Sequence, residues 1–202
     1  IIYSSIKNSS QTIGDGDIFC IAQKIISKSE GCIIDLKKIT PSKEALNYAK
    51  KLNKDPRKVQ VILDQSQCII RSFRHKNSNE GVMICEHNLG FISANAGVDE
   101  SNIDGEDQVI TLPLNPDKSA NLLQKKLQKL FNSKIGIVIT DTFGRPWRIG
   151  QVNVAIGLSG IPATIKEKGN LDSFGKKINV TEPAFADEIA AASGLLMKKS
   201  KK

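Results

Sequence analysis

The 202-residue sequence predicts an α+β fold with a mixed or antiparallel sheet and flanking helices. Short β-branched or apolar segments follow one another at residues 68–73, 82–85 and 91–94, which is typical of strands joined by turns. Helical periodicity is confined to separate segments, and the chain contains no internal repeat. Neighbouring strands with segregated helices favour the α+β class.

The first predicted strand covers residues 17–26, DIFCIAQKII, a nearly continuous apolar run after the turn-like GDGD at 14–17. Lys24 and the polar stretch 27–31 interrupt this run, so we expect a strand followed by a polar loop. Thr40-Pro41 and Asp55-Pro56 each have the form of a helix N-cap followed by a proline in the first turn. Two short surface helices are therefore expected. Their apolar faces would be Ala45, Leu46, Ala49 and Leu52 in one and Val59, Ile62 and Leu63 in the other.

The remaining elements are expected in the second half of the chain. After the three strands named above, with a turn near residues 77–81, a helix over about residues 118–132 precedes a strand at 135–140. A last helix is predicted from Thr181 or Glu182 to about Met197. No linker divides the sequence, so we expect a single domain over residues 1–202.

Composition excludes several classes of function. The sequence has no run of about 18 apolar residues and no signal-peptide pattern, so we expect a soluble cytoplasmic protein with no membrane partner. Four of the net +8 charges lie in a basic tail at residues 198–202, and this does not favour nucleic-acid binding.

The four cysteines lack metal-site spacing, so buried free thiols are favoured over a metal site or disulfides. The chain begins at Ile1 and its only methionines are Met83 and Met197, so we expect a fragment.

One candidate site is NAGVDESNID, residues 95–104, which follows the strand predicted at 91–94. Its oxygen-bearing side chains are those of Asn95, Asp99, Ser101, Asn102 and Asp104. Oxygen ligands of this kind suit hard cations, and Gly97 permits a tight turn. Polar turns of this composition are common, so a purely structural turn is favoured for this stretch taken alone.

A second candidate is ITDTFGRPWRIGQVNVAIG, residues 139–157. Asp141 and Thr142 are expected to project from the carboxyl end of the strand at 135–140, where oxygen atoms suit a cation that accompanies a nucleotide. Arg145 and Arg148 could neutralise a phosphate or a carboxylate. The alternative has Asp141 capping a turn, Arg145 pairing with it and Trp147 packing in the core, and the residues favour neither.

The third candidate is the lysine loop at residues 27–31, SKSEG, which suits an anionic phosphate but lacks the P-loop pattern. In isolation an exposed basic turn is favoured. His75 and His87 do not form a convincing catalytic pair, and no nucleophile stands at a recognisable spacing, so a serine or cysteine hydrolase is not supported. The three candidates together indicate a nucleotide-dependent transferase or ligase.

Four ordered motifs resemble those of the coenzyme F420-0:γ-glutamyl ligase family. They are AQKIISKSEG, EHNLGFISANAGVDESNI, TDTFGRPWRIGQVNVAIG and VTEPAFADEIAAASGLLM, and the segment KDPRKVQVIL is also similar to that family. The resemblance covers about residues 14 to 197. Four motifs in the same order are far less expected by chance than one.

The resemblance implies an α+β homodimer that uses GTP, Mg²⁺ or Mn²⁺, and K⁺. The implied reaction adds L-glutamate to the lactyl carboxylate of coenzyme F420-0 and then adds further glutamate through γ-linkage. Phosphorylation of the carboxylate by GTP would give an acyl phosphate that the glutamate amine attacks.

Individual residues carry over where the motifs match. Asp99, Asp141 and Thr142 resemble the metal ligands of the family. Ser27, Lys28 and Asn102 fall at its GTP-contacting positions. Arg145 and Arg148 are our own candidates for binding substrate anions or stabilising phosphoryl charge, whereas packing is slightly favoured over stacking for Trp147.

The sequence also departs from the family pattern. Family members have a nucleotide-contacting Pro-Leu segment before the position of Ile1, and a loop and final strand after the helix that matches residues 181–197. These terminal segments are absent here, and Cys32 replaces a frequent basic residue. We therefore expect a terminally truncated member with impaired catalysis. Two alternatives are a non-catalytic protein that binds a nucleotide or F420, and an amide ligase acting on another carboxylate.

Overall fold

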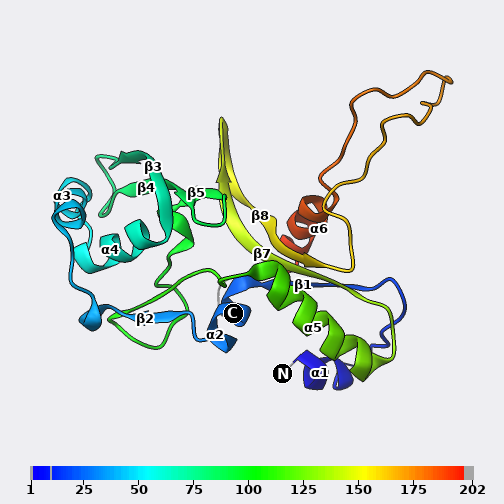
Figure 1. Ribbon diagram of the computed structural model, residues 1–202, viewed down its shortest axis with the longest axis horizontal. Coiled ribbons are helices and arrows are strands. Elements are labelled where there is room, and N and C mark those ends of the chain that lie inside the picture. Colours follow the sequence, from blue (N-terminus) through cyan, green and yellow to red (C-terminus); the bar gives the residue numbers. More distant parts are fainter. Residues whose placement is uncertain (1, 10, 198–202) are drawn as a thin grey trace. The chain divides into compact units, whose positions relative to one another are not determined.

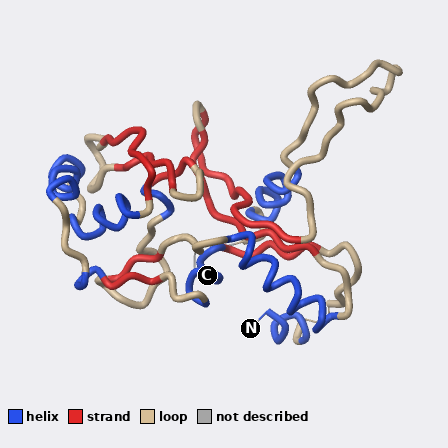
Figure 2. Tube along the Cα trace, in the orientation of Figure 1, coloured by secondary structure: helices blue, strands red, loops and turns tan. Residues whose placement is uncertain are grey.

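The computed structural model describes residues 2–9 and 11–197, and these divide into two compact units. The terminal unit consists of Ile1–Gln23 and Leu114–Lys202, and the central unit consists of Lys24–Pro113. Each unit contains both helices and strands (Figure 2). The α+β class is confirmed. The basic tail at 198–202 lies outside the described residues, and the prediction of a single domain stays a prediction.

The terminal unit is built on a three-stranded sheet of order β1-β7-β8 (Figure 1). Its elements are α1 (Ile2–Lys7), β1 (Ile18–Ala22), α5 (Pro116–Phe131), β7 (Gly136–Arg145), β8 (Arg148–Ser159) and α6 (Phe185–Gly194). β7 pairs parallel with β1 and antiparallel with β8, so the sheet is mixed, as predicted. Ile137, Val138 and Ile139 are fully buried in β7, because this central strand has a partner on each side.

β7 continues beyond the three-stranded part of the sheet, and this corrects the prediction that the strand ends at Thr140. Ala22, the last residue of β1, pairs with Thr140, whereas β8 pairs with β7 as far as Arg145. Figure 1 shows the two strands leaving the sheet as a ribbon. We call residues 141–152 the projecting hairpin. The prediction missed β8, whose alternating apolar residues favour a strand but whose extent depends on pairing with β7.

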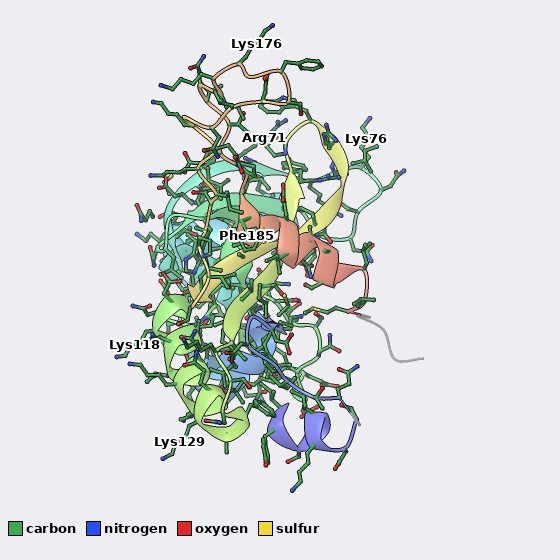
Figure 3. The ribbon with its side chains drawn as sticks, turned by 90° about the vertical axis from the view of Figure 1, so that its right-hand side faces the viewer. Arg71, Lys76, Lys118, Lys129, Lys176 and Phe185 are labelled. Carbon is green, nitrogen blue, oxygen red and sulfur yellow. The ribbon has the colours of Figure 1, made fainter. Side chains whose placement is uncertain are left out.

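Helix α5 lies against the sheet through small and apolar side chains. Asn115 caps it through the Lys118 amide, and Pro116 occupies its first turn, so the helix starts two residues before the predicted position. Ala120 and Leu127 are buried, whereas Lys118 and Lys129 point outward (Figure 3). The buried Gln124 donates to the Ile135 carbonyl at 2.7 Å and accepts from the Ser159 hydroxyl at 2.6 Å. These two bonds tie the helix to the ends of both long strands.

Residues 160–184 form an extended arm of the terminal unit. Its two limbs are joined by backbone bonds from Glu167 to Thr181 and from Gly169 to Ile178. Lys176 lies at its far end, whereas Phe185 begins α6 (Figure 3). The last helix was therefore predicted to start too early, because residues 181–184 belong to the arm.

The central unit has two small sheets and a pair of helices. Its elements are α2 (Gln23–Ser29, whose first residue belongs to the terminal unit), β2 (Ile33–Asp35), the 3₁₀ turn η1 (Leu36–Lys38), α3 (Lys43–Leu52), α4 (Pro56–Asp64), β3 (Ser66–Phe73), β4 (Val82–His87), β5 (Ile92–Ala94), η2 (Asn95–Gly97) and β6 (Gln108–Ile110). β2 pairs with β6, and β3, β4 and β5 form an antiparallel sheet. The three strands predicted for this sheet are confirmed.

Apolar side chains of α3, α4 and β4 form the core of the central unit. Leu52, Val59, Ile62 and Met83 are all fully buried. The predicted face of α3 is correct except for Leu46, which is 51% exposed. The α4 start at Asp55-Pro56 is confirmed, whereas Ser42 rather than Thr40 caps α3, since its hydroxyl accepts from the Ala45 amide.

The predicted strand at 17–26 is wrong in its second half. β1 ends at Ala22 and α2 begins at Gln23, so Ser27, Lys28 and Ser29 are helical rather than part of a loop. Ile26 is buried but Ile25 is 52% exposed, as expected for neighbouring residues of a helix. A short apolar run does not distinguish a buried strand from a buried helical turn by periodicity.

All four cysteines carry free thiols, but only Cys85 is buried. Cys20 and Cys32 are half-buried and Cys68 is exposed, so the prediction of buried thiols holds for one residue. None of the helices that the structure describes combines the length and the hydrophobicity needed to cross a bilayer.

His87 ends β4 with its imidazole buried and neutral. The side chain is 3% exposed, its Nδ1 accepts from the Leu89 amide at 2.9 Å, and its Nε2 has no hydrogen-bond partner among the described residues. Burial lowers the pKa of His87 below its ordinary value of 6.5. The folded state therefore favours the uncharged ring over the charged one.

This burial predicts a histidine-dependent loss of stability in mild acid. Above the unfolded pKa of about 6.5 neither state binds the proton, whereas below it only the unfolded state does. The free energy of unfolding should fall by about 1.4 kcal/mol per pH unit below that value, until the folded pKa is reached. Urea unfolding across this range should show the slope in the wild type. It should be absent in His87→Asn, whose amide oxygen can accept the same Leu89 bond; equal slopes would contradict the assignment.

Candidate functional site

In the central unit, α2 lies beside the loop 99–102. Lys24 and Lys28 are four residues apart on α2 and therefore share one face of the helix. The Lys24 ammonium contacts the Asp99 carboxylate at 2.5 Å, and that of Lys28 donates to the Asn102 carbonyl at 2.5 Å. Two of the predicted site residues, Lys28 and Asn102, are thus brought together, with Asp99 three residues from Asn102. We call Lys24, Lys28 and residues 99–102 the lysine-carboxylate cluster.

Asp99 is held at both its backbone and its side chain. Its amide and carbonyl pair with Ile110 at 3.1 and 2.8 Å, which fixes the start of the loop. Its Oδ1 accepts from the Glu100 and Ser101 amides, and its Oδ2 accepts from Lys24 and from the Ser101 hydroxyl. Burial by itself raises the pKa of Asp99, but the bonds from Lys24 and Ser101 outweigh it, so the pKa lies below its ordinary value.

The two other residues predicted to contact GTP differ in exposure. Asn102 is exposed and adopts a left-handed backbone with φ of 58°, a conformation that asparagine tolerates better than most residues. Ser27 is fully buried on α2, and its carbonyl accepts from the Cys32 amide. Their contacts with a nucleotide stay predictions.

Lys58 of α4 supports the loop, and Lys54, in the turn before α4, shares the partner Glu80 with it. Lys58 donates to Glu100 at 2.6 Å and to Glu80 at 3.3 Å, and Lys54 donates to Glu80 at 2.7 Å. Burial by itself lowers the pKa of Lys58, but the two carboxylates outweigh it and raise the pKa above its ordinary value. Because the Lys58 side chain is nearly buried, its ion pair holds Glu100, the residue that follows Asp99, in place.

In the terminal unit, Asp141 and Thr142 are the first residues of the projecting hairpin. They lie within β7 opposite Val154 and Asn153, which corrects the prediction of a loop after the strand. Both side chains are half-buried, and the Thr142 hydroxyl donates to Asn153 Oδ1 at 2.9 Å. A carboxylate and a hydroxyl thus follow directly after the three-stranded part of the sheet. They are hard oxygen donors on a rigid element.

The tip of the hairpin carries the predicted arginines and the tryptophan. Arg145 and Arg148 pair across the turn and are exposed, and Arg145 donates to the Ile149 carbonyl at 3.1 Å. Trp147 is 100% exposed and has a φ of 56°. The prediction that Trp147 packs in the core is therefore wrong. The two-residue turn moves its ring away from the sheet, at a backbone conformation that is uncommon for a bulky residue.

Each unit by itself offers oxygen atoms that suit a hard divalent cation such as Mg²⁺ or Mn²⁺. Asp99, Asp141 and Thr142 offer only oxygen atoms, which these ions prefer. Among the described residues there is no group of three or more histidine, cysteine or acidic side chains that could hold a metal. The two carboxylates lie in different units.

Sequence reasoning missed the roles of Lys24 and Lys58. Lys24 was interpreted as an interruption of a strand, although its four-residue spacing from Lys28 is the signal that places both on one helical face. Lys58 is an ordinary residue of the amphipathic α4 pattern. Only its burial between Glu80 and Glu100 shows that it supports the loop, and no local pattern predicts that contact.

The central unit has a carboxylate loop held by lysines, and the terminal unit has an acid and a hydroxyl side by side on a strand. Groups of these kinds are typical of enzymes that activate phosphates or carboxylates. Comparisons with known proteins narrow this class to the ligases. The chain belongs to the F420-0:Gamma-glutamyl ligase family, whose family model matches residues 1–202. The resemblance noted in the sequence is thereby confirmed.

Three relatives illustrate the extent of the similarity, and each is named coenzyme F420:L-glutamate ligase. The protein of Methanocaldococcus jannaschii is 46% identical over 185 residues, which cover 92% of this chain and 71% of that protein. The protein of Methanothermobacter thermautotrophicus is 41% identical over 197 residues, or 98% of this chain and 75% of the relative. The protein of Archaeoglobus fulgidus is 36% identical over 183 residues, which cover 91% of this chain and 70% of that protein.

Proposed function

We propose that the protein is a GTP-dependent ligase that joins L-glutamate to the lactyl carboxylate of coenzyme F420-0, and then adds further γ-linked glutamate. The observation that carries this proposal is the family membership over the whole chain, together with relatives named for this ligation. Because GTP and free glutamate are cytoplasmic metabolites, the proposal includes a cytoplasmic location.

The chemistry requires an activated carboxylate, because oxide is a very poor leaving group. In the proposed sequence an oxygen of the F420-0 carboxylate attacks the γ-phosphorus of GTP, and the bond to the β-phosphate oxygen breaks to release GDP. The resulting acyl phosphate is attacked by the glutamate amine. Amide formation then expels inorganic phosphate, and the amine loses its proton. Each addition therefore consumes one GTP and one glutamate.

Residues that the structure describes are proposed to bind the charged groups that take part in this reaction. Lys28 and Asn102, with Ser27 on the same helix as Lys28, are proposed to contact the GTP phosphates. Asp99, Asp141 and Thr142 are proposed ligands for Mg²⁺ or Mn²⁺, which would stabilise charge on the transferring phosphoryl group. Arg145 and Arg148 are proposed to bind substrate anions, since exposed guanidinium groups pair well with carboxylates and phosphates. A K⁺ requirement is also part of the proposal, without an assigned residue.

Calorimetry combined with nucleotide analysis separates this proposal from its alternatives. The ligase should release GDP over repeated turnovers only when F420-0 and glutamate are both present, because the acyl phosphate formed without glutamate stops the reaction after one GDP. Binding of GTP or F420-0 with no GDP formed would instead identify a non-catalytic binding protein. GDP release with another carboxylic acid, but not with F420-0, would identify an amide ligase of different specificity.

We also propose that the protein acts as a homodimer. Trp147 and Ile149 are completely exposed at the tip of the projecting hairpin, and large apolar side chains in such positions are typical of association surfaces. Light scattering should give twice the chain mass, and the mass of a single chain would contradict the proposal.

A further inference from the structure

Lys24 uses its whole donor capacity on the loop 99–102. Its ammonium contacts Asp99 Oδ2 at 2.5 Å, the Ser101 hydroxyl at 2.5 Å and the Ser101 carbonyl at 3.2 Å. A lysine ammonium has three donors and no acceptor, so each N–H has a partner. The side chain is 24% exposed and α2 holds its backbone, so the ammonium is placed at the carboxylate rather than in open solvent.

The Asp99 carboxylate has no acceptor position left for a cation. It offers about four lone-pair sites, and four donors occupy them. Three come from the loop itself: the Glu100 and Ser101 amides and the Ser101 hydroxyl. These bonds orient the carboxylate without neutralising it. Lys24 supplies the fourth, and it forms the only ion pair of Asp99 among the described residues.

We propose that Lys24 is a positioning residue whose ammonium competes with a divalent cation for the Asp99 carboxylate. A divalent cation can coordinate Asp99 Oδ2 only after the ammonium leaves, and the flexible lysine stem allows this movement from a fixed helix. In the ligase proposed above, the phosphate groups that arrive with the cation would receive the released ammonium. The inference rests on the proposed function, which supplies both the cation role of Asp99 and the identity of the displacing ligand.

This competition has a distinctive consequence. Removing the ammonium should strengthen cation binding to the nucleotide-free protein, whereas simple damage to the site would weaken it. The loss of one charge-assisted hydrogen bond corresponds to about a tenfold change in affinity. We therefore expect Lys24→Met to bind Mn²⁺ about tenfold more tightly than the wild type, with no GTP or F420-0 present.

Electron paramagnetic resonance of free Mn²⁺ measures this affinity without turnover. Lys24→Arg keeps the charge and should resemble the wild type, and the double variant Lys24→Met with Asp99→Asn should lose the gain. Lys51→Met is the matched control for loss of a positive charge in the same unit, because Lys51 is exposed and its ammonium donates to the Ser72 hydroxyl rather than to the loop 99–102. Unchanged or weaker Mn²⁺ binding in Lys24→Met, or a gain that survives Asp99→Asn, would overturn the inference.

The two proposals fail separately. Tighter Mn²⁺ binding in Lys24→Met alongside a wild type that never forms GDP would leave the role of Lys24 standing and reject the ligase. GTP-dependent glutamate addition by the wild type, with no change of Mn²⁺ affinity in Lys24→Met, would support the ligase and reject the role of Lys24.

Discussion

Replacing Asp141 by asparagine is expected to abolish most ligase turnover while the protein stays folded. Asparagine has nearly the same volume and can occupy the same position in β7 opposite Val154. It lacks the negative charge that would hold a cation beside the transferring phosphoryl group. Because removing a single group that stabilises transition-state charge costs about 10²–10³ in rate, we expect a loss of that order in GDP release.

Asp15→Asn is the matched control for this substitution. Asp15 belongs to the same unit, is exposed, and accepts a hydrogen bond from the Lys134 amide that an asparagine oxygen can also accept. It should keep wild-type turnover, and both variants should unfold within about 0.5 kcal/mol of the wild type. Full activity in Asp141→Asn would show that Asp141 serves only the strand.

Gly157→Ala is expected to be among the most destabilising single substitutions in the terminal unit. A Cβ at this position of β8 would lie 2.6 Å from both the carbonyl carbon and Cβ of Pro116, and 2.7 Å from the Pro116 oxygen. Two of these atoms are backbone at the start of α5, so the whole helix must move away from the sheet. Overpacking of this kind costs about 1–3 kcal/mol, and we expect the upper end because no flexible side chain can yield.

Gly144→Ala provides the comparison in the same sheet. A Cβ at Gly144 would meet no atom within 4 Å. Alanine there should change the free energy of unfolding by less than about 0.5 kcal/mol, as at other exposed positions. Urea unfolding followed by circular dichroism measures both variants. Equal stabilities would mean that α5 does not pack on β8 as closely as described.

Local signals explain which elements could be predicted from the sequence. Asp55 and Pro56 cap and start α4 through contacts within the first turn, so the start was predicted correctly. The extent of β7 past Thr140 depends instead on pairing with β8, which no local pattern specifies. The change from β1 to α2 at Gln23 falls inside one apolar run, where the strand and helix alternatives bury similar side chains.

The candidate site likewise has features that the sequence predicted and features that it did not. Lys28 and Asn102 were chosen from motifs 74 positions apart, and their contact is observed. The contact of Lys24 with Asp99 was not predicted, because it requires residues 23–29 to be helical rather than part of a strand and a loop. For Trp147, packing was slightly favoured over stacking on a flat ring. The structure differs from that expectation, because Trp147 lies in the two-residue turn at the tip of the hairpin and its side chain is completely exposed.

The most direct test of the proposed function follows glutamate into the product. Purified protein is incubated with F420-0, GTP, Mn²⁺ and isotopically labelled L-glutamate, and the deazaflavin is analysed by mass spectrometry. We predict F420-0 carrying one labelled glutamyl unit, then species with more, and one GDP released for each unit. Unmodified F420-0 and unconsumed GTP, from folded protein that binds Mn²⁺, would contradict the proposed function.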